Sequence, residues 1–158
     1  MSPRKQHPNP HARLDAIAWR TIHDRKRPRG VPTPPRNFGE LPPCEGPEFS
    51  ESLNAFLDRF YWWKRPEALQ IEPPLGFAPE YRAFLAAVAE FLCHEFTIQV
   101  PAWVAEPGYC LKVEWDAAAD LEEVPWVLVI PIEERRAKAA PEFLSRNIIF
   151  PSRGLICV

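Results

Sequence analysis

PEYRAFLAAVAEFLCHEF, residues Pro79–Phe96, is the stretch that decides the fold of this chain. A proline followed by a glutamate is typical of a helix's first turn, where the proline's missing N–H has no partner to lose. Apolar side chains then recur at helical spacing, at Tyr81, Leu85, Val88, Leu92 and Phe96, with Phe84 and Phe91 beside them. A helix that is apolar on nearly all sides is buried. We therefore predict that this helix is central and that Leu85, Val88 and Leu92 lie inside the core.

A second amphipathic helix is predicted before it. Ser50 fits an N-cap, and Glu51 then falls in the first turn, where a negative charge is favourable. Apolar residues follow at positions i, i+3, i+4 and i+7, namely Leu53, Phe56, Leu57 and Phe60. Because the residue before a proline avoids the helical conformation, Pro66 ends the helix.

The end of that helix reads RFYWWKRP, Arg59–Pro66, and its aromatic side chains are either core or binding surface. Phe60 belongs to the apolar face, and Trp63, three residues later, should be at least half buried. Trp62 lies about 200° around the helix from Phe60, so we expect it to be the most exposed of the three. We predict a partner-binding surface at Trp62 and Tyr61. The alternative is that another segment of the chain covers Trp62.

The C-terminal third mixes short helices with β structure. Single helical turns are predicted at PAWV and PEFLSR, and a helix at IEERRAKAA. Between Tyr109 and Ile132 the choice of strand or helix stays open: YCLKVEW alternates like a strand, whereas WVLVI fits either a buried strand or a buried helix. NIIF and LICV, joined by PSRG, predict a terminal hairpin, since Pro and Gly favour its loop. The expected fold is mainly α with a small β component: a compact helical domain with a C-terminal hairpin.

The N-terminal region is predicted to be a basic, proline-rich arm. The chain holds 20 prolines in 158 residues, well above the average share of about 5%. Residues 1–37 carry nine Lys or Arg and two Asp, a net charge of +7, whereas residues 38–158 carry ten basic and nineteen acidic residues, a net charge of −9. We interpret residues 1–48 as the arm, with one short helix at about residues 10–24, and residues 49–158 as a single globular domain.

Charge asymmetry of this kind can mark an arm that binds nucleic acid, because cationic side chains neutralise phosphates. The residues that would do so are Arg20, Arg25, Lys26, Arg27 and Arg29, with Trp19 as a stacking group. The other interpretation is that the arm rests on its own acidic domain.

No pattern of catalytic, metal-binding or cofactor-binding residues is recognisable. The cysteines and histidines lack the spacing of metal ligands, and Cys93, His94 and Glu95 point in different directions on a helix. Glycine-rich phosphate loops and a GxSxG motif are absent from the sequence. We predict no catalytic residue, metal or cofactor, although the sequence leaves open whether any activity exists. Four cysteines without CxxC spacing, and no apolar N-terminal segment, predict a cytoplasmic protein.

From Phe49 onward the chain resembles an uncharacterised family of small bacterial proteins. The resemblance is carried by ESLNAFLDRFY, PAWVAEP and PEFLSRNIIFPSRGL and spans roughly residues 49–157, with a departure between Glu114 and Glu134. Members are often encoded beside nucleotidyltransferases of toxin–antitoxin type, and some carry an N-terminal helix-turn-helix, for which this arm is too short and proline-rich. The resemblance implies an interaction or regulatory role.

Together these features lead us to expect a non-catalytic protein-interaction or regulatory protein, antitoxin-like in a bacterial two-gene system, with a protein partner encoded nearby. Nucleic-acid binding through the arm is the alternative function. No membrane association is expected, because the longest apolar run is too short to span a bilayer.

Overall fold

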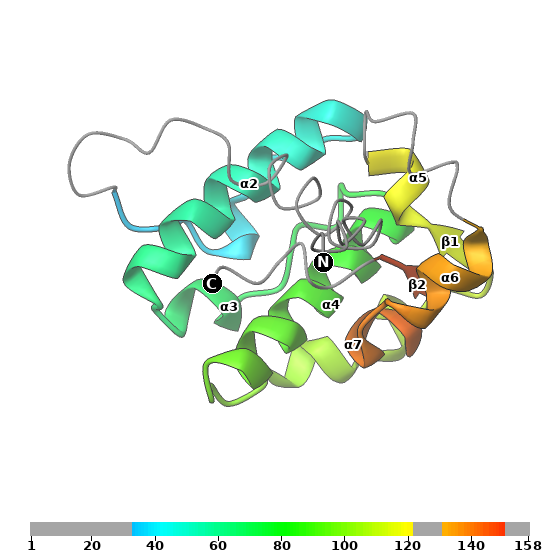
Figure 1. The fold of residues 1–158 in the computed structure, drawn as a ribbon. Coiled ribbons are helices and arrows are strands. Elements are labelled where there is room, and N and C mark those ends of the chain that lie inside the picture. The colour runs from blue at the N-terminus through cyan, green and yellow to red at the C-terminus, as the bar shows by residue number, and fades with distance from the viewer. Residues whose placement is uncertain (1–32, 122–130, 151–158) are drawn as a thin grey trace, which may run out of the picture.

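The computed structural model describes residues 33–121 and 131–150 (Figure 1). In chain order the elements are η1 (Phe38–Glu40), α2 (Gly46–Trp63), α3 (Glu67–Gln70), α4 (Pro79–Glu95), η2 (Ala102–Ala105), η3 (Pro107–Tyr109), β1 (Trp115–Asp116), α5 (Ala117–Leu121), α6 (Ile132–Ala137), α7 (Pro141–Leu144) and β2 (Ile148–Ile149). Helices dominate, and the β structure of the described residues is one two-stranded sheet. The predicted fold class, mainly α with a small β component, is confirmed.

The two long helices, α2 and α4, run in the same direction. Near the start of α2, the ring of Phe49 lies 4.5 Å from that of Tyr81 and 5.8 Å from that of Phe84, both in the first turns of α4. Near the end of α2, the ring of Phe60 lies 5.9 Å from that of Phe96, which directly follows α4. The N-terminal ends of the two helices therefore lie together, and so do their C-terminal ends, at opposite ends of the molecule (Figure 1).

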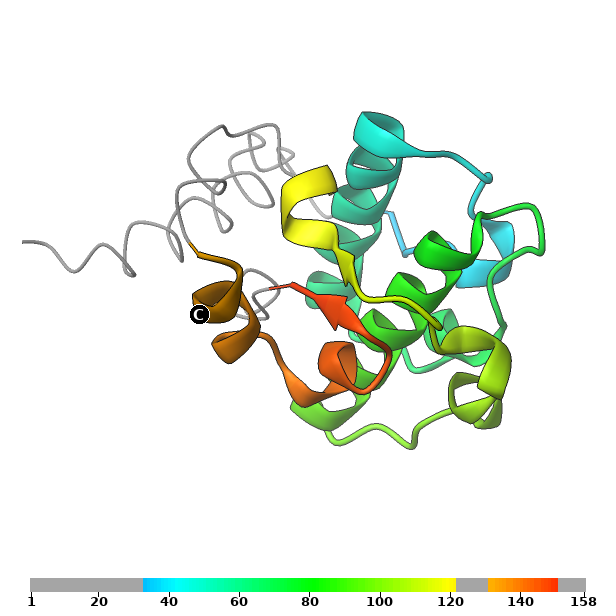
Figure 2. The same cartoon turned by 90° about the vertical axis from the view of Figure 1, so that its right-hand side faces the viewer.

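The central position of α4 is confirmed. Leu85, Val88 and Leu92 are each fully buried. Besides α2, which faces it through aromatic rings, α4 contacts η2, η3 and α7. Figure 2 shows the short C-terminal elements β2 and α7 lying over this helix. An element covered from several directions has to be apolar around most of its circumference, which explains the composition of this stretch.

The start of α2 differs from the prediction. Its N-cap is Glu45 and its first residue is Gly46, with Pro47 in the first turn, so Ser50 lies within the helix. The Ser50 hydroxyl donates instead to the carbonyl of Leu121, at 3.3 Å. The N–H of Gly46 donates to the Tyr81 hydroxyl at 2.9 Å, so a residue of α4 satisfies one of the free N–H groups at this helix end.

The packed core also begins earlier than residue 49, the predicted start of the globular domain. Phe38 is fully buried, with its ring 4.5 Å from that of Phe56 and 6.3 Å from that of Trp103. Leu41 is buried as well. The segment around η1 was assigned to the arm because of its prolines, yet one phenylalanine buries enough apolar surface to hold it on the core. The helix predicted at residues 10–24 lies outside the described residues.

The sheet is parallel, with Trp115 opposite Ile148 and Asp116 opposite Ile149. NIIF thus supplies a strand, as predicted, and its described partner is β1; the loop and second arm of the predicted hairpin, residues 151–158, lie outside the described residues. The strand signal of YCLKVEW was misleading except at Trp115, since Tyr109 belongs to η3.

The remaining short elements follow the predictions more closely. The turn predicted at PAWV is η2, the helix predicted at IEERRAKAA is α6, and the turn predicted at PEFLSR is α7. The WVLVI stretch lies outside the described residues, so its choice between strand and helix stays open.

Candidate protein-binding surface

The C-terminal end of α2 is shaped by the proline two residues after Lys64. Pro66 disfavours the helical conformation at Arg65, so the helix has to end before it. It ends at Trp63, and Lys64 adopts the left-handed conformation with φ 47° while its N–H donates to the Phe60 carbonyl at 2.6 Å. Because of this turn, the side chains of Lys64 and Arg65 no longer follow the helical spacing of the residues before them.

The aromatic side chains of this end divide as the helical periodicity predicts. Phe60 is fully buried, Tyr61 and Trp63 are partly buried, and Trp62 is 60% exposed. The ring of Tyr61 packs against that of Phe96 at 5.7 Å, so most of Tyr61 belongs to the contact between the two long helices. Of the two predicted partner-binding residues, Trp62 presents a broad apolar surface to solvent, and Tyr61 is only partly exposed.

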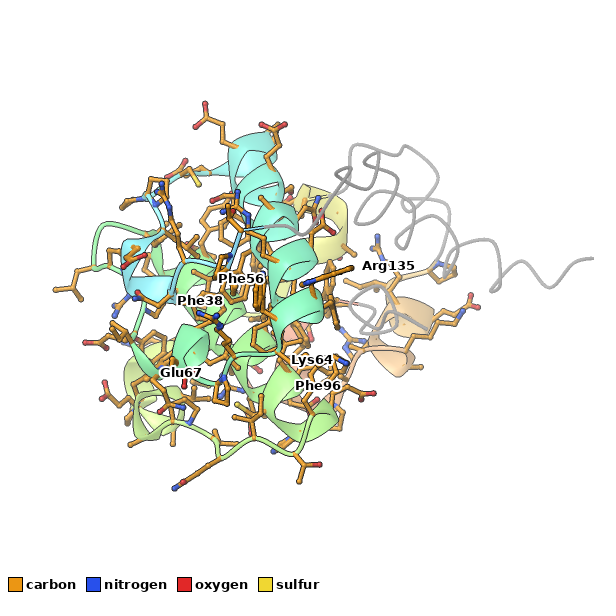
Figure 3. All side chains as sticks on the ribbon, turned by 90° about the vertical axis from the view of Figure 1, so that its left-hand side faces the viewer. Phe38, Phe56, Lys64, Glu67, Phe96 and Arg135 are labelled. Carbon is orange, nitrogen blue, oxygen red and sulfur yellow. The ribbon has the colours of Figure 1, made fainter. Side chains whose placement is uncertain are left out.

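Two cations lie against neighbouring aromatic rings. The Arg65 guanidinium is 4.7 Å from the centre of the Trp63 ring, and the Lys64 ammonium is 5.4 Å from the centre of the Phe96 ring. Figure 3 shows Lys64 and Phe96 side by side below the end of α2, with Glu67 set apart from them. Both distances are within the range of favourable cation–π contacts.

These cations have no carboxylate partner within the described part of the chain. The ion pairs there join His94 to Glu142, Arg135 to Asp116, Arg136 to Glu114 and Arg146 to Glu90. Arg59, one helical turn before Trp62 and partly exposed, is likewise without an ion pair among the described residues. We call the group Arg59, Trp62, Lys64 and Arg65 the α2-end surface.

The surface predicted from the sequence, Trp62 and Tyr61, did not include the basic residues that flank them in the chain. The signal was the lysine and arginine directly before Pro66, where the chain has to leave the helix. The nucleic-acid-binding residues predicted in the arm, Arg20, Arg25, Lys26, Arg27 and Arg29, lie outside the described residues, as does Trp19.

Several other polar groups of the described structure join parts of the fold through hydrogen bonds and ion pairs. The Tyr109 hydroxyl donates to Glu72 at 2.7 Å and accepts from Arg82 at 3.0 Å, which ties the loop after α3 to η3 and α4. Burial and the hydrogen bond to Glu72 raise the pKa of Tyr109 to about 12. Asp116 is paired with Arg135, and Asp120 accepts from the Trp115 indole, so both are occupied.

The described cysteines and acidic residues form no recognisable reactive centre. Burial and the nearby Glu90 raise the pKa of the Cys93 thiol to about 11, so it is protonated at neutral pH. Within residues 33–121 and 131–150, no group of three or more His, Cys, Asp or Glu side chains is placed to hold a metal ion. No helix of these residues combines the length and apolar character needed to cross a membrane.

Comparison with protein-family models, with curated proteins and with solved structures gave no match. The resemblance to the small bacterial family therefore stays an expectation from the sequence.

Proposed function

We propose that this is a non-catalytic protein-interaction protein and that Trp62 anchors a protein partner on the α2-end surface. The observation that carries the proposal is the exposure of Trp62, 60% in a helix whose preceding aromatic residues are buried or partly buried. Tryptophan is enriched among the residues that dominate binding energy in protein interfaces. An indole on an ordered helix can enter a partner's pocket with little loss of conformational freedom.

A protein partner fits this surface better than a single-stranded nucleic acid. Nucleic acids stack successive bases on several exposed rings along a basic groove. Here Arg65 lies against the Trp63 ring and Lys64 against the Phe96 ring, so that among the described residues Trp62 is the one broadly exposed ring at this end.

The proposal includes a regulatory, antitoxin-like role in a bacterial two-gene system, a cytoplasmic location and a partner encoded by a neighbouring gene. Its support is the sequence resemblance from Phe49 onward together with the absence of a recognisable catalytic pattern in the sequence. Nucleic-acid binding through the basic arm is the competing function.

The test compares the full-length protein with Trp62→Ala and with Leu75→Ala. Leu75 is 81% exposed, and its neighbour Gly76 lies against Pro43, just before the start of α2. Leu75 is thus an exposed apolar residue at the opposite end of α2 from Trp62, which makes it a matched control. Each immobilised protein is exposed to lysate of the source organism, and a stoichiometric partner is identified, purified and titrated by calorimetry.

We expect Trp62→Ala to weaken binding of the purified partner by about 30-fold or more, the level of an interface hot spot. Leu75→Ala should bind within about twofold of the unchanged protein, because isolated surface residues contribute little. Equal binding by Trp62→Ala, or failure to recover a stoichiometric partner, would refute the proposal. Retention of nucleic acid on a filter at low salt, lost steeply as salt rises, would favour the competing function.

A further inference from the structure

Lys64 occupies a position where glycine is the favoured residue. It follows the last residue of α2 with φ 47°, in the left-handed region. Helices commonly end in this conformation, and the residue there is usually glycine because a Cβ atom is unfavourable. A lysine at this site therefore carries a conformational penalty, and the property it adds is a positive charge.

The left-handed turn determines where that charge lies. The Lys64 ammonium sits over the Phe96 ring at 5.4 Å, and the Arg65 guanidinium over the Trp63 ring at 4.7 Å. Each ring restricts a long side chain that would otherwise sample many rotamers, so less freedom is lost when the cation meets a ligand. Arg59 lies three residues before Trp62 and is its neighbour on the helix surface.

The acidic residues nearest in sequence to this surface, Asp58 and Glu67, form no ion pair with its cations within the described residues. Asp58 has an interaction of its own, and Glu67 is set apart from the Lys64–Phe96 pair (Figure 3). Arg59, Lys64 and Arg65 thus lie within three residues of Trp62 along the chain, and within the described residues these cations form no ion pair.

We propose that Arg59, Lys64 and Arg65 form a basic rim that binds carboxylates of an acidic protein partner, whose Asp and Glu side chains border the apolar recess that receives Trp62. This inference depends on the proposed function and specifies the chemistry of the partner. Charge-assisted hydrogen bonds from arginine and lysine to carboxylates are short and strong. Charges at the rim of an interface mainly accelerate association and exclude partners of the same sign.

The first test needs only the full-length protein and two ions. Quenching of tryptophan fluorescence by iodide and by caesium is measured at low, constant ionic strength, and the contribution of Trp62 is taken as the difference from Trp62→Phe. We expect the iodide-to-caesium ratio of the Trp62 quenching constants to exceed that of N-acetyltryptophanamide on the order of threefold, because neighbouring cations concentrate iodide and repel caesium. The double variant Lys64→Gly, Arg65→Gln should lower this ratio toward that of the free compound. A Trp62 ratio equal to that of the free compound would overturn the proposed rim.

The second test uses the purified partner from the lysate experiment. The double variant should reduce the association rate constant on the order of tenfold at low salt and flatten its dependence on salt. Should Trp62→Ala abolish binding while the double variant binds with unchanged rate and salt dependence, the protein-interaction function would stand and the acidic partner would be refuted. Unchanged binding by Trp62→Ala would refute both the proposed function and the acidic-partner inference. A basic partner or a nucleic acid would overturn the acidic-partner inference.

Discussion

The Nη1 atom of Arg146 lies 2.5 Å from the Oε2 atom of Glu90, and this pair of a buried guanidinium and a partly buried carboxylate joins the segment between α7 and β2 to α4. The same guanidinium donates to the carbonyls of Glu142, at 2.7 Å, and Val104, at 3.0 Å. Three segments that are distant in sequence, around Glu90, Val104 and residues 142–146, thus converge on one side chain that is 7% exposed.

Arg146→Met should destabilise the fold by about 3–5 kcal/mol, because it leaves a partly buried carboxylate and two carbonyls without their donor. Arg136→Met is the matched control, since its pair with Glu114 is exposed and should matter little. Urea unfolding of both variants gives the comparison. Similar small losses in the two variants would show that the Arg146 network contributes no more than a surface pair.

Leu92→Ala should cost about 2–5 kcal/mol, since its side chain is fully buried in α4 and its removal leaves a cavity. Leu75→Ala removes the same atoms from an exposed loop and should change the free energy of unfolding by less than about 0.5 kcal/mol. Thermal or urea unfolding measures both. A Leu92→Ala variant as stable as the Leu75→Ala variant would contradict the burial of the α4 stripe.

Trp62→Ala should leave the free energy of unfolding within about 0.5 kcal/mol of the unchanged protein, because most of the indole already contacts solvent. Phe60→Ala, two residues earlier, should cost about 3–5 kcal/mol, since the Phe60 ring is fully buried. Melting curves of the two variants separate these outcomes. A loss of several kcal/mol from Trp62→Ala would mean that another segment covers Trp62, and the α2-end surface would no longer be a binding candidate.

Tyr109 should titrate in the folded protein near its raised pKa of about 12, above the ordinary value of about 10. Burial favours the neutral phenol, and the phenol is the form that donates to Glu72. The stability that the raised pKa of Tyr109 contributes is therefore fully present below about pH 10 and is lost as the pH rises from there through about 12. Alkaline difference absorbance and unfolding at several pH values measure both effects, with Tyr109→Phe as the control that lacks the titration. A folded protein in which every tyrosine titrates near pH 10 would contradict this.

Lys64→Gly and Lys64→Ala both remove the contact with Phe96, but only alanine keeps a Cβ atom at φ 47°. The glycine variant should be the more stable of the two by about 1 kcal/mol, the typical penalty for a side chain in this conformation. Unfolding experiments on the pair isolate the backbone effect from the loss of charge. Equal stability would mean that the end of α2 readjusts, and that the placement of Lys64 over Phe96 does not depend on the left-handed turn.

Much of the helical core was predictable because it depends on local periodicity. The spacing of Leu85, Val88 and Leu92 specified one buried face of α4 irrespective of its neighbours. The same reasoning placed Phe60 inside and Trp62 outside, because one helical turn determines the directions of both side chains. Pro66 located the end of α2 through a steric effect between adjacent residues.

The strand signal at Tyr109–Trp115 misled because alternation describes only the local chain. Tyr109 is held in η3 by Arg82 and Glu72, which come from distant parts of the sequence. Similarly, Phe38 stands among prolines, and only its contacts with Phe56 and Trp103 reveal that it belongs to the core.

The sequence by itself determined the two long helices, their apolar faces and the exposure of Trp62, since these follow from interactions within a few residues along the chain. Only the tertiary structure decided that α2 and α4 run in the same direction, that β1 pairs with β2, and that Lys64 lies over Phe96. These arrangements depend on aromatic contacts and hydrogen bonds between segments tens of residues apart. Their energies compete with many alternative pairings, and no local pattern selects among them.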